Sequence, residues 1–440
     1  MREMKNSNII WLGSIPSDWN ILRVKNTSWL KGRIGWDGLK SEEFTDEGPY
    51  LITGTDFSDG KVNWDTCAHI TEDRFSEDEL LHIKEGDLLI TKDGTIGKLA
   101  IVEGCPEKVS LNSGVMIIRN NSSWRYDQKF MYYILGSEVF TQWFESEQKP
   151  GSTIRHLYQH QFGEFRFPFP SLSEQQSIVS YLDKKCAAID EAIARRKKII
   201  EKLYEFRMSK IADLVLMKDR NSRYETDNPY FKSMPVGVKI SSIRRHFSVK
   251  LGKMLCSEAR TEDDSLEQYY CAADVHFEGI NYSDLKQMWF STKEKAQYLV
   301  KNGDMLVVEG GAGAGGSYVV SEQKTPTYIQ NSILRIRGTK SGSVRYLKYL
   351  VEYLVKNGYI AYACNTATFS HFTNDKVSDT PFPAIDLDEQ EKIADKLDAI
   401  DMQINEMVSG YQKIIEKLEE YRKSIIYNAI TGKIDCREVV

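Results

Sequence analysis

The sequence Lys-Ile-Ile-Glu-Lys-Leu occurs twice in this chain, at residues 198–203 and again 215 residues later at residues 413–418. Each copy is preceded by Pro-Phe-Pro and Glu-Gln and is followed by an aromatic residue and an arginine. A weaker match near the start of each half, Gly86-Asp-Leu-Leu89 with Gly303-Asp-Met-Leu306, has a slightly different offset. This period is far longer than that of solenoid repeats. The sequence therefore indicates a duplicated domain whose loops differ in length between the copies.

Length and composition set the class of protein. The 440 residues are enough for two to four domains, and 41% hydrophobic with 11% aromatic residues is typical of globular proteins. No apolar run approaches the roughly 18 residues of a membrane span, and no apolar segment of a secretory signal stands near residue 1. The seven cysteines are scattered without a CxxC pair, which favours reduced thiols over a zinc site or disulfides. We expect a cytoplasmic protein without a membrane partner.

A long helix is the strongest local signal in the second copy. Asp388 with Glu391 predicts a capped start, and Gly432 lies where a helix commonly ends. Between them, ten apolar residues alternate spacings of four and three, which is the signature of a coiled-coil seam. These seam residues are Ile393, Leu397, Ile400, Ile404, Met407, Tyr411, Ile414, Leu418, Tyr421 and Ile425.

The first copy predicts a similar helix, with Ser173 and Gln176 as its start. Its seam is interrupted by Lys185, Arg196 and Lys210, which disfavours the pairing of two identical first helices. Its apolar seam residues include Ile178, Leu182, Ile189, Ile199, Leu203 and Phe206.

The two helices are expected to pack on each other, since neither seam is stable alone in water. At 1.5 Å per residue, each helix would span about 60 Å. In the order domain, helix, domain, helix, an antiparallel pairing gives the simpler path for the chain between residues 217 and 231.

The globular parts are predicted to consist mostly of strands. Apolar runs at residues 86–90 and 99–102 flank a glycine-containing turn, and residues 304–308 and 318–320 repeat the pattern in the second half. Helices are expected near residues 128–144 and 344–355. The predicted fold class is α+β, with two mixed globular domains separated by two long helices packed as an antiparallel coiled coil. The predicted segments are globular residues 1–170, helical residues 171–220, globular residues 221–386 and helical residues 387–440.

This order of domains resembles the DNA-specificity subunit of type I restriction–modification systems, over essentially the whole chain. The resemblance rests on the duplicated Pro-Phe-Pro and Glu-Gln signals and on the Gly-Asp-Leu-Leu-Ile…Gly-Thr-Ile-Gly-Lys run at residues 86–98. It implies a noncatalytic protein in which two target recognition domains each read one half of an asymmetric, bipartite DNA site. The helices would set the gap between the halves and bind modification (methyltransferase) subunits, which in turn carry the motor subunits. It also implies no cofactor in this chain, with S-adenosylmethionine and ATP on the partner subunits.

Candidate DNA contacts lie in loops that combine cations, hydroxyls and glycines, because such groups bond phosphates and base edges. The alternatives are an ordinary solvated turn, a cap or a solubilising charge, and for His156 and His371 the alternative is stabilisation of the junction between domain and helix. The net charge of −5 gives no global reason to bind nucleic acid, so affinity is expected to be local or shared with partner subunits. The candidates are Lys31, Arg33, Lys92, Thr95, Lys98, Ser152, Thr153, Arg155 and His156 in the first half, and Lys250, Lys253, Thr366, Thr368, Ser370 and His371 in the second.

Three motifs resemble sites of chemistry but lack essential parts. Gly311–Gly316 matches GxGxxG, yet a strand-like run follows it where a dinucleotide fold needs a helix. Residues 94–98 end like a P-loop without its first glycine or its Ser/Thr, and Asp227-Asn-Pro-Tyr230 lacks a proline of the amino-methyltransferase motif. We interpret them as two hairpin tips and a linker. The rival hypotheses are a self-contained methyltransferase or nuclease, and a coiled-coil scaffold that binds only proteins.

Overall fold

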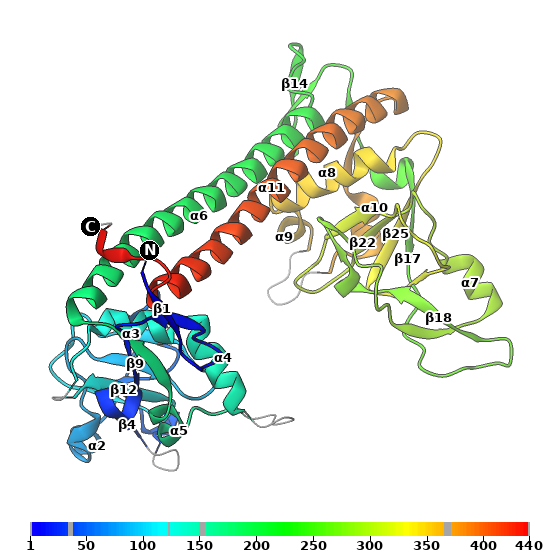
Figure 1. Ribbon diagram of the computed structural model, residues 1–440. Coiled ribbons are helices and arrows are strands. Elements are labelled where there is room, and N and C mark those ends of the chain that lie inside the picture. The colour runs from blue at the N-terminus through cyan, green and yellow to red at the C-terminus, as the bar shows by residue number, and fades with distance from the viewer. Residues whose placement is uncertain (1, 34–37, 122–123, 149–154, 365–370, 439–440) are drawn as a thin grey trace. The chain divides into compact units, whose positions relative to one another are not determined.

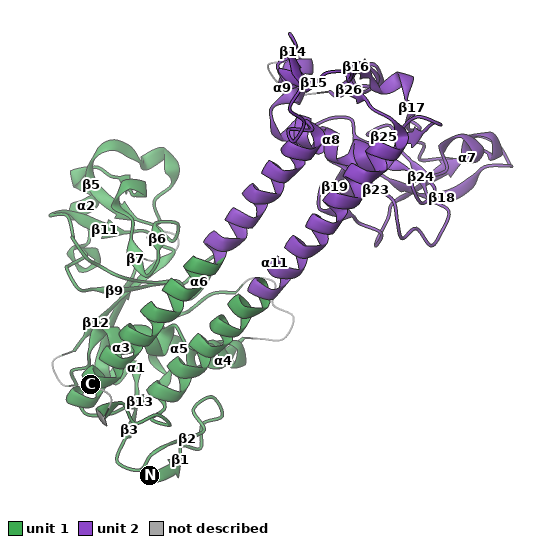
Figure 2. Cartoon of the chain, turned by 90° about the horizontal axis from the view of Figure 1, so that it is seen from above, with its two compact units in different colours: residues 1–196, 412–440 green, residues 197–411 purple. Residues whose placement is uncertain are grey.

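The structure is a computed structural model that describes residues 2–33, 38–121, 124–148, 155–364 and 371–438. The chain divides into two compact units (Figure 2): unit 1 comprises residues 1–196 and 412–440, and unit 2 comprises residues 197–411. The division cuts both long helices, α6 (Leu172–Val215) and α11 (Leu387–Ile430), so that each unit holds a part of both. The four-segment division made from the sequence stays a prediction.

Unit 1 contains thirteen strands and five short helices among its described residues (Figure 1). Its strands are β1 (Met4–Asn6), β2 (Ser14–Pro16), β3 (Asn20–Arg23), β4 (Ser28–Gly32), β5 (Thr45–Ile52), β6 (Phe57–Ser58), β7 (Lys61–Val62), β8 (Ala68–His69), β9 (Leu88–Thr91), β10 (Leu99–Ile101), β11 (Val109–Leu111), β12 (Val115–Asn120) and β13 (Arg166–Phe169). Its short helices are α1 (Val24–Thr27), α2 (Glu72–Ser76), α3 (Gln128–Leu135), α4 (Glu138–Glu147) and α5 (Gln159–Gly163).

Unit 2 has the same number of strands and four short helices among its described residues. Its strands are β14 (Arg223–Glu225), β15 (Ser233–Pro235), β16 (Lys239–Ser242), β17 (Phe247–Leu251), β18 (Ser265–Tyr270), β19 (Val275–His276), β20 (Gly279–Ile280), β21 (Gln287–Phe290), β22 (Met305–Val308), β23 (Ser317–Val319), β24 (Tyr328–Ile329), β25 (Ile333–Gly338) and β26 (Pro381–Ala384). Its short helices are α7 (Thr292–Tyr298), α8 (Val344–Lys356), α9 (Tyr359–Cys364) and α10 (Asn374–Asp379).

The strand order confirms the duplication. The order β4-β12-β9-β10 in unit 1 corresponds to β17-β25-β22-β23 in unit 2. The three-stranded sheet β11-β5-β8 likewise corresponds to β24-β18-β21, and the pair β13-β3 to β26-β16. Two sequences that match at few positions therefore fold into the same topology, and the α+β fold class is confirmed.

The central strands are apolar throughout because both of their faces are covered. In β22, Met305 and Val307 belong to the cluster that contains the long helices, whereas Leu306 and Val308 face a second cluster beyond the sheet. Strand β9 divides its side chains between two clusters in the same way. Successive side chains of a strand point to opposite faces, so a continuous apolar run is expected for a strand covered on both sides.

The two long helices run in opposite directions within each unit. In unit 1, Ile178 near the start of α6 shares a core with Ile430 at the end of α11. In unit 2, Val215 at the end of α6 shares a core with Ile393 near the start of α11. Arg422 and Asp190 add an ion pair between the helices in unit 1, at 3.3 Å. The predicted antiparallel pairing is confirmed.

The predicted seam is correct near the helix ends and wrong between them. Five of its members are well exposed, with exposed fractions between 39% and 51%: Ile199, Phe206, Met407, Ile414 and Tyr421. Seven are buried: Ile178, Leu182, Ile189, Ile393, Leu397, Ile404 and Ile425. Leu203, Ile400, Tyr411 and Leu418 are partly buried. A straight helix drifts by about 20° per heptad from a strict 3.5-residue repeat, so the buried stripe passes to neighbours such as Val408 and Ile426.

Both long helices begin two residues before the starts predicted from Ser173 and Asp388. The first residue of α6 is Leu172, so Ser171 rather than Ser173 stands before it and accepts the amide of Glu174 at 3.4 Å. The first residue of α11 is Leu387, so Asp386 replaces Asp388 as the residue before the helix. The capping-box spacing holds from these positions, shifted by two residues.

The repeated glutamine of the Glu-Gln signal joins the start of each long helix to a short helix. Gln175 is fully buried, accepts the amide of Asp127 at 2.8 Å and donates to the carbonyl of Pro170 at 2.9 Å. Gln390 is also fully buried and accepts the amide of Ser343 at 2.8 Å. Asp127 and Ser343 are the N-caps of α3 and α8, so each glutamine satisfies a main-chain group that burial would otherwise leave without water.

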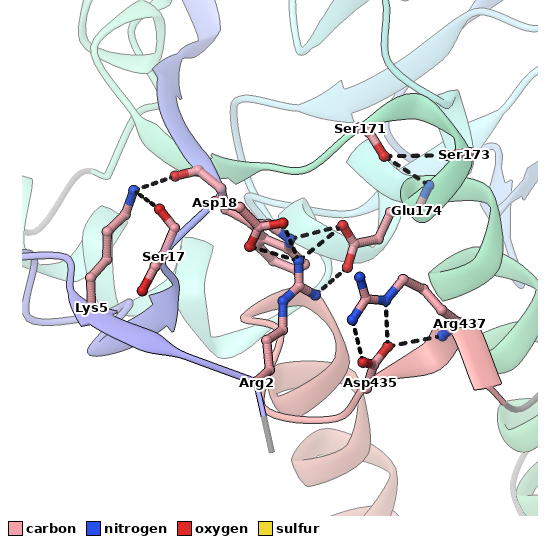
Figure 3. A network of polar contacts seen from close by, with 10 residues as sticks. Arg2, Lys5, Ser17, Asp18, Ser171, Ser173, Glu174, Asp435 and Arg437 are labelled. Carbon is pink, nitrogen blue, oxygen red and sulfur yellow. Dashed lines mark hydrogen bonds and ion pairs between the residues drawn. The ribbon is translucent and has the colours of Figure 1, made fainter.

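Residues from both ends of the described chain meet at the start of α6 (Figure 3). Arg2 pairs with Glu174 and lies 2.8 Å from Asp18, while the indole of Trp19 donates to Glu174 at 3.0 Å. After α11, the hydrogen bond from Arg437 lowers the pKa of Asp435 to about 2. The contacts of Arg2 and Trp19 hold the N-terminal hairpin against the start of α6 in unit 1.

Gly432 allows the chain to turn back at the end of α11. Its φ is +70°, and a Cβ here would lie 2.4 Å from Cγ of Pro16 and 3.0 Å from the ring of Trp19. We predict that Gly432→Ala lowers the free energy of unfolding by about 2 kcal/mol, because the clash adds to left-handed strain. Denaturant unfolding measures this change.

Alkylation provides a local readout for the same variant. Burial raises the pKa of the Cys436 thiol to about 11, so iodoacetamide at pH 8 should spare it in the wild type and modify it in Gly432→Ala. Gly410→Ala is the control: a Cβ there meets nothing within 4 Å inside α11, and the substitution should stabilise by about 1 kcal/mol. Equal stability of the two variants would contradict the clash.

Candidate nucleic-acid interface

The hairpin tip between β9 and β10 is an ordered turn. Thr91 anchors it, because its hydroxyl donates to the carbonyl of Thr95 at 2.6 Å and accepts the amide of Lys98 at 2.9 Å. Gly94 and Gly97 have φ values of +64° and +85°, which glycine adopts without strain. The predicted hairpin is confirmed, and Thr95 and Lys98 are exposed on it.

Lys92 is not available to DNA, in contrast to Lys98. Its side chain is 9% exposed, and its ammonium donates to the carbonyl of Arg33 at 2.9 Å. Burial lowers the pKa of Lys92. The prediction that Lys92 faces phosphate is wrong, because its main-chain partner lies inside the unit.

Arg33 is also turned inward. It is 2% exposed, and its Nε donates to the carbonyl of Leu111 at 3.2 Å. The interpretation of Arg33 as a surface contact is therefore wrong. Lys31 is partly exposed and forms an ion pair with Asp78 at 2.8 Å, so DNA would have to compete for it.

In unit 2, the two predicted lysines have different environments. Lys253 is 5% exposed, and its ammonium bonds the carbonyl of Trp289 and the carboxylate of Glu294, both at 2.6 Å. It also lies over the ring of Phe290, so the prediction of a DNA contact at Lys253 is wrong. Lys250 is partly exposed, with its ammonium 5.6 Å from the ring centre of Tyr298.

The two histidines lie beside the hairpin tips of their units. His156 pairs with Asp93, and His371 lies 3.3 Å from the carboxylate of Glu309. Arg155 is exposed and lines a cavity of about 320 Å³ together with the tip glycines Gly94 and Gly97. Ser152, Thr153, Thr366, Thr368 and Ser370 lie outside the described residues.

Sequence reasoning missed Tyr158 as a candidate contact. Its ring is 51% exposed, and its centre lies 4.4 Å from that of His156, beside the tip of the first hairpin. An exposed aromatic ring next to cations is a surface on which bases stack. The sequence does place Tyr158 and His160 at alternate positions after His156. It does not show whether their rings are exposed.

The motifs that resemble sites of chemistry occupy loops. Gly311–Gly316 joins the antiparallel strands β22 and β23, so no helix begins there to hold a pyrophosphate. Asn228 lies in the loop between β14 and β15, where its side chain accepts the amide of Tyr230 at 3.0 Å. Within the described ranges, no group of three or more His, Cys, Asp or Glu side chains is placed to hold a metal ion. No helix in the same ranges is long and apolar enough to cross a membrane.

Comparisons with known proteins agree with this architecture. Residues 30–202 match the family model of the type I restriction modification DNA specificity domain. The protein named as the MjaX specificity subunit of a type I restriction enzyme of Methanocaldococcus jannaschii is 22% identical over 443 residues, covering 96% of this chain and 95% of that protein. The EcoBI specificity subunit of Escherichia coli is 23% identical over 44% of this chain and 41% of its own length.

Solved structures share the fold. A chain from a study of complex assembly and conformational transition of the type I R-M system has a TM-score of 0.72 at 15% identity, covering 96% of this chain and 99% of that one. The HsdS subunit from Thermoanaerobacter tengcongensis has a TM-score of 0.52 at 15% identity, with 96% and 98% covered. The duplicated fold is thus the fold of these solved chains, and both sequence relatives are named as type I specificity subunits. Over nearly its whole length this chain is similar to a protein named as a type I restriction enzyme specificity subunit, and residues 30–202 match the DNA specificity domain of that family.

Lys253 is buried and Lys250 is partly exposed, so substituting each of them tests whether Lys253 stabilises the fold and Lys250 does not. We predict that Lys253→Ala lowers the free energy of unfolding by about 2 kcal/mol, since it leaves Glu294 and a carbonyl without their shared cation. Lys250→Ala, three residues away in sequence, should change it by less than about 0.5 kcal/mol. Thermal unfolding followed by circular dichroism compares the two, and a larger loss in Lys250→Ala would reverse the assignment.

Proposed function

We propose that this chain is the DNA-reading subunit of a type I restriction–modification complex and that each unit reads one half of an asymmetric, bipartite site. The observation that carries the proposal is the repetition of one strand order with different side chains at the exposed tips. A shared framework places the two tips at the same point of the fold. The different tips, Thr95 and Lys98 in one unit and Gly311–Gly316 in the other, suit different half-sites.

In this proposal the long helices set the separation of the two half-sites. Each has 44 residues, which corresponds to about 66 Å of continuous helix. One turn of B-DNA is about 34 Å, so such helices suit half-sites more than one turn apart.

The same helices are the proposed binding surface for modification subunits. Side chains such as Phe206 and Tyr421 would be covered by a partner helix, and their exposed fractions of 51% and 50% support this. The modification subunits would hold S-adenosylmethionine, and motor subunits bound to them would use ATP. With a net charge of −5 and three of its candidate cations buried, the chain would share DNA binding with these partners.

Mapping of methylated adenines tests the function. A host with this gene and its partner genes should show one bipartite methylated site that is absent without the gene. Replacing residues 1–170 by the matching segment of another family member should change one half of that site and keep the other half and the gap. A change in both halves would contradict one unit per half-site, and an unchanged site would contradict DNA reading by this segment.

Single substitutions test the first tip. We predict that Lys98→Ala and Arg155→Ala each weaken binding of the assembled complex to its site by about threefold to tenfold without lowering the unfolding temperature, because both side chains are exposed. If Lys98 contacts phosphate, the slope of log affinity against log salt should fall by about one in Lys98→Ala. Equilibrium binding at several salt concentrations measures both effects, and wild-type affinity in both variants would remove these assignments.

A further inference from the structure

Each unit closes its hairpin tip against the segment that precedes the Pro-Phe-Pro strand. The closure uses a main-chain hydrogen bond at equivalent places: the amide of Leu157 donates to the carbonyl of Lys92 at 3.0 Å, and that of Phe372 donates to the carbonyl of Glu309 at 2.6 Å. In both units the residue just before this amide is a histidine that pairs with a carboxylate of the tip. Both copies of the duplicated domain therefore build the same pair of links, although their sequences differ at the tips.

The carboxylates come from positions that are not equivalent. The main-chain bonds align Lys92 with Glu309, so Asp93 of unit 1 aligns with Gly310 of unit 2. In unit 1 the position equivalent to Glu309 is occupied by Lys92, whose ammonium donates a hydrogen bond to the carbonyl of Arg33. The next residue then supplies the acid. The histidine pairs with a carboxylate in both units even though that carboxylate stands at different positions of the two tips. This indicates that the contact is required, and that it is more than two residues kept from a common ancestor.

The groups around each histidine fit this role. His156 is 26% exposed in its side chain, pairs with Asp93 and has the ring of Tyr158 against it. The carbonyl of His371 accepts hydrogen bonds from the ammonium of Lys376 at 2.9 Å and from the thiol of Cys364, so its main chain is also held by residues outside the tip. Each imidazole therefore bridges a segment held in the core to a tip that projects from the sheet.

The bridge joins two sets of exposed groups into one surface. Thr95 and Lys98 lie on the tip of unit 1, while Arg155 and Tyr158 lie on the segment beside it. With the main-chain bond alone, each segment could turn about that bond. A second link removes this freedom before DNA binds, and such preorganisation lowers the entropic cost of binding.

We propose that His156 and His371 are positioning residues for DNA reading, each of which holds the reading surface of its own unit in one arrangement through its carboxylate. This rests on the proposed function, with unit 1 and unit 2 reading different half-sites. The histidine acts through Asp93 or Glu309 and not by touching a base.

The test uses the full complex with its modification subunits and a duplex that carries the site found by methylation mapping. Competing duplexes have one or the other half-site scrambled. His156→Ala should weaken binding to the intact site by about threefold to tenfold and reduce the penalty for scrambling one half-site, while the penalty for the other half stays unchanged. His371→Ala should do the same for the opposite half. Affinity for the doubly scrambled duplex should not change.

Conservative and double substitutions separate positioning from general damage. His156→Asn keeps a nitrogen near the place of Nδ1 and should recover most of the lost discrimination. His156→Ala combined with Asp93→Ala should bind no more weakly than His156→Ala alone. His276→Ala is the matched control in unit 2, since its ring pairs with the carbonyl of Ala273, and it should bind as the wild type does.

Three results would overturn the proposal: wild-type discrimination in both alanine variants, additive losses in the double variant, or equal losses at both half-sites from either histidine. Failure of the proposed function looks different, because the unaltered complex would then retain the mapped duplex no better than the doubly scrambled one.

Discussion

Both units depend on apolar packing between the ends of two helices that are far apart in sequence. Unit 1 buries Ile178 and Leu182 of α6 together with Ile426 and Ile430 of α11, and unit 2 buries the opposite ends of the same helices. Unit 1 is therefore made of two separate pieces of chain, whereas unit 2 is one continuous piece. Because the end of α11 is synthesised last, unit 1 can complete its core only after the whole of unit 2 has been made.

Buried polar groups fix the position of each helix on its unit. Asp183 accepts the hydroxyl of Tyr133 at 2.7 Å, and Asp398 accepts that of Tyr349 at the equivalent place in unit 2. Apolar packing tolerates sliding of one helix along another, whereas a buried hydroxyl or amide must find its partner. The repeated tyrosine–aspartate and glutamine contacts thus select one arrangement in both copies.

The copies nevertheless differ where the repeat is closest in sequence. Arg207 and Arg422 follow matching aromatic residues, yet Arg207 lies between Glu352 and Asp401, with Glu352 only 3% exposed. Arg422 pairs across to Asp190 instead. Both arginines therefore bind the neighbouring long helix, and Arg207 in addition binds Glu352 of the globular part of unit 2. Such differences show that a common framework carries different internal contacts in its two copies.

The sequence alone was sufficient for the duplication, the α+β class, the two long helices, their antiparallel pairing and the hairpin tips. These features follow from local periodicity, from turn residues and from the repeat itself, all of which can be recognised in the sequence. It was not sufficient for the exposed seam positions Ile199, Phe206, Met407, Ile414 and Tyr421 or for the helix starts, because small drifts of helical phase and a choice among nearby caps depend on packing.

The roles of the cations were decided only by the tertiary structure. Lys92, Arg33 and Lys253 look like surface charges in sequence, but each ends beside a carbonyl or carboxylate supplied by a distant strand or loop. Lys98 stays exposed although it is six residues from Lys92. The burial of a side chain depends on neighbours that are distant in sequence and are brought close by the fold. The local pattern of residues in a loop does not identify these neighbours.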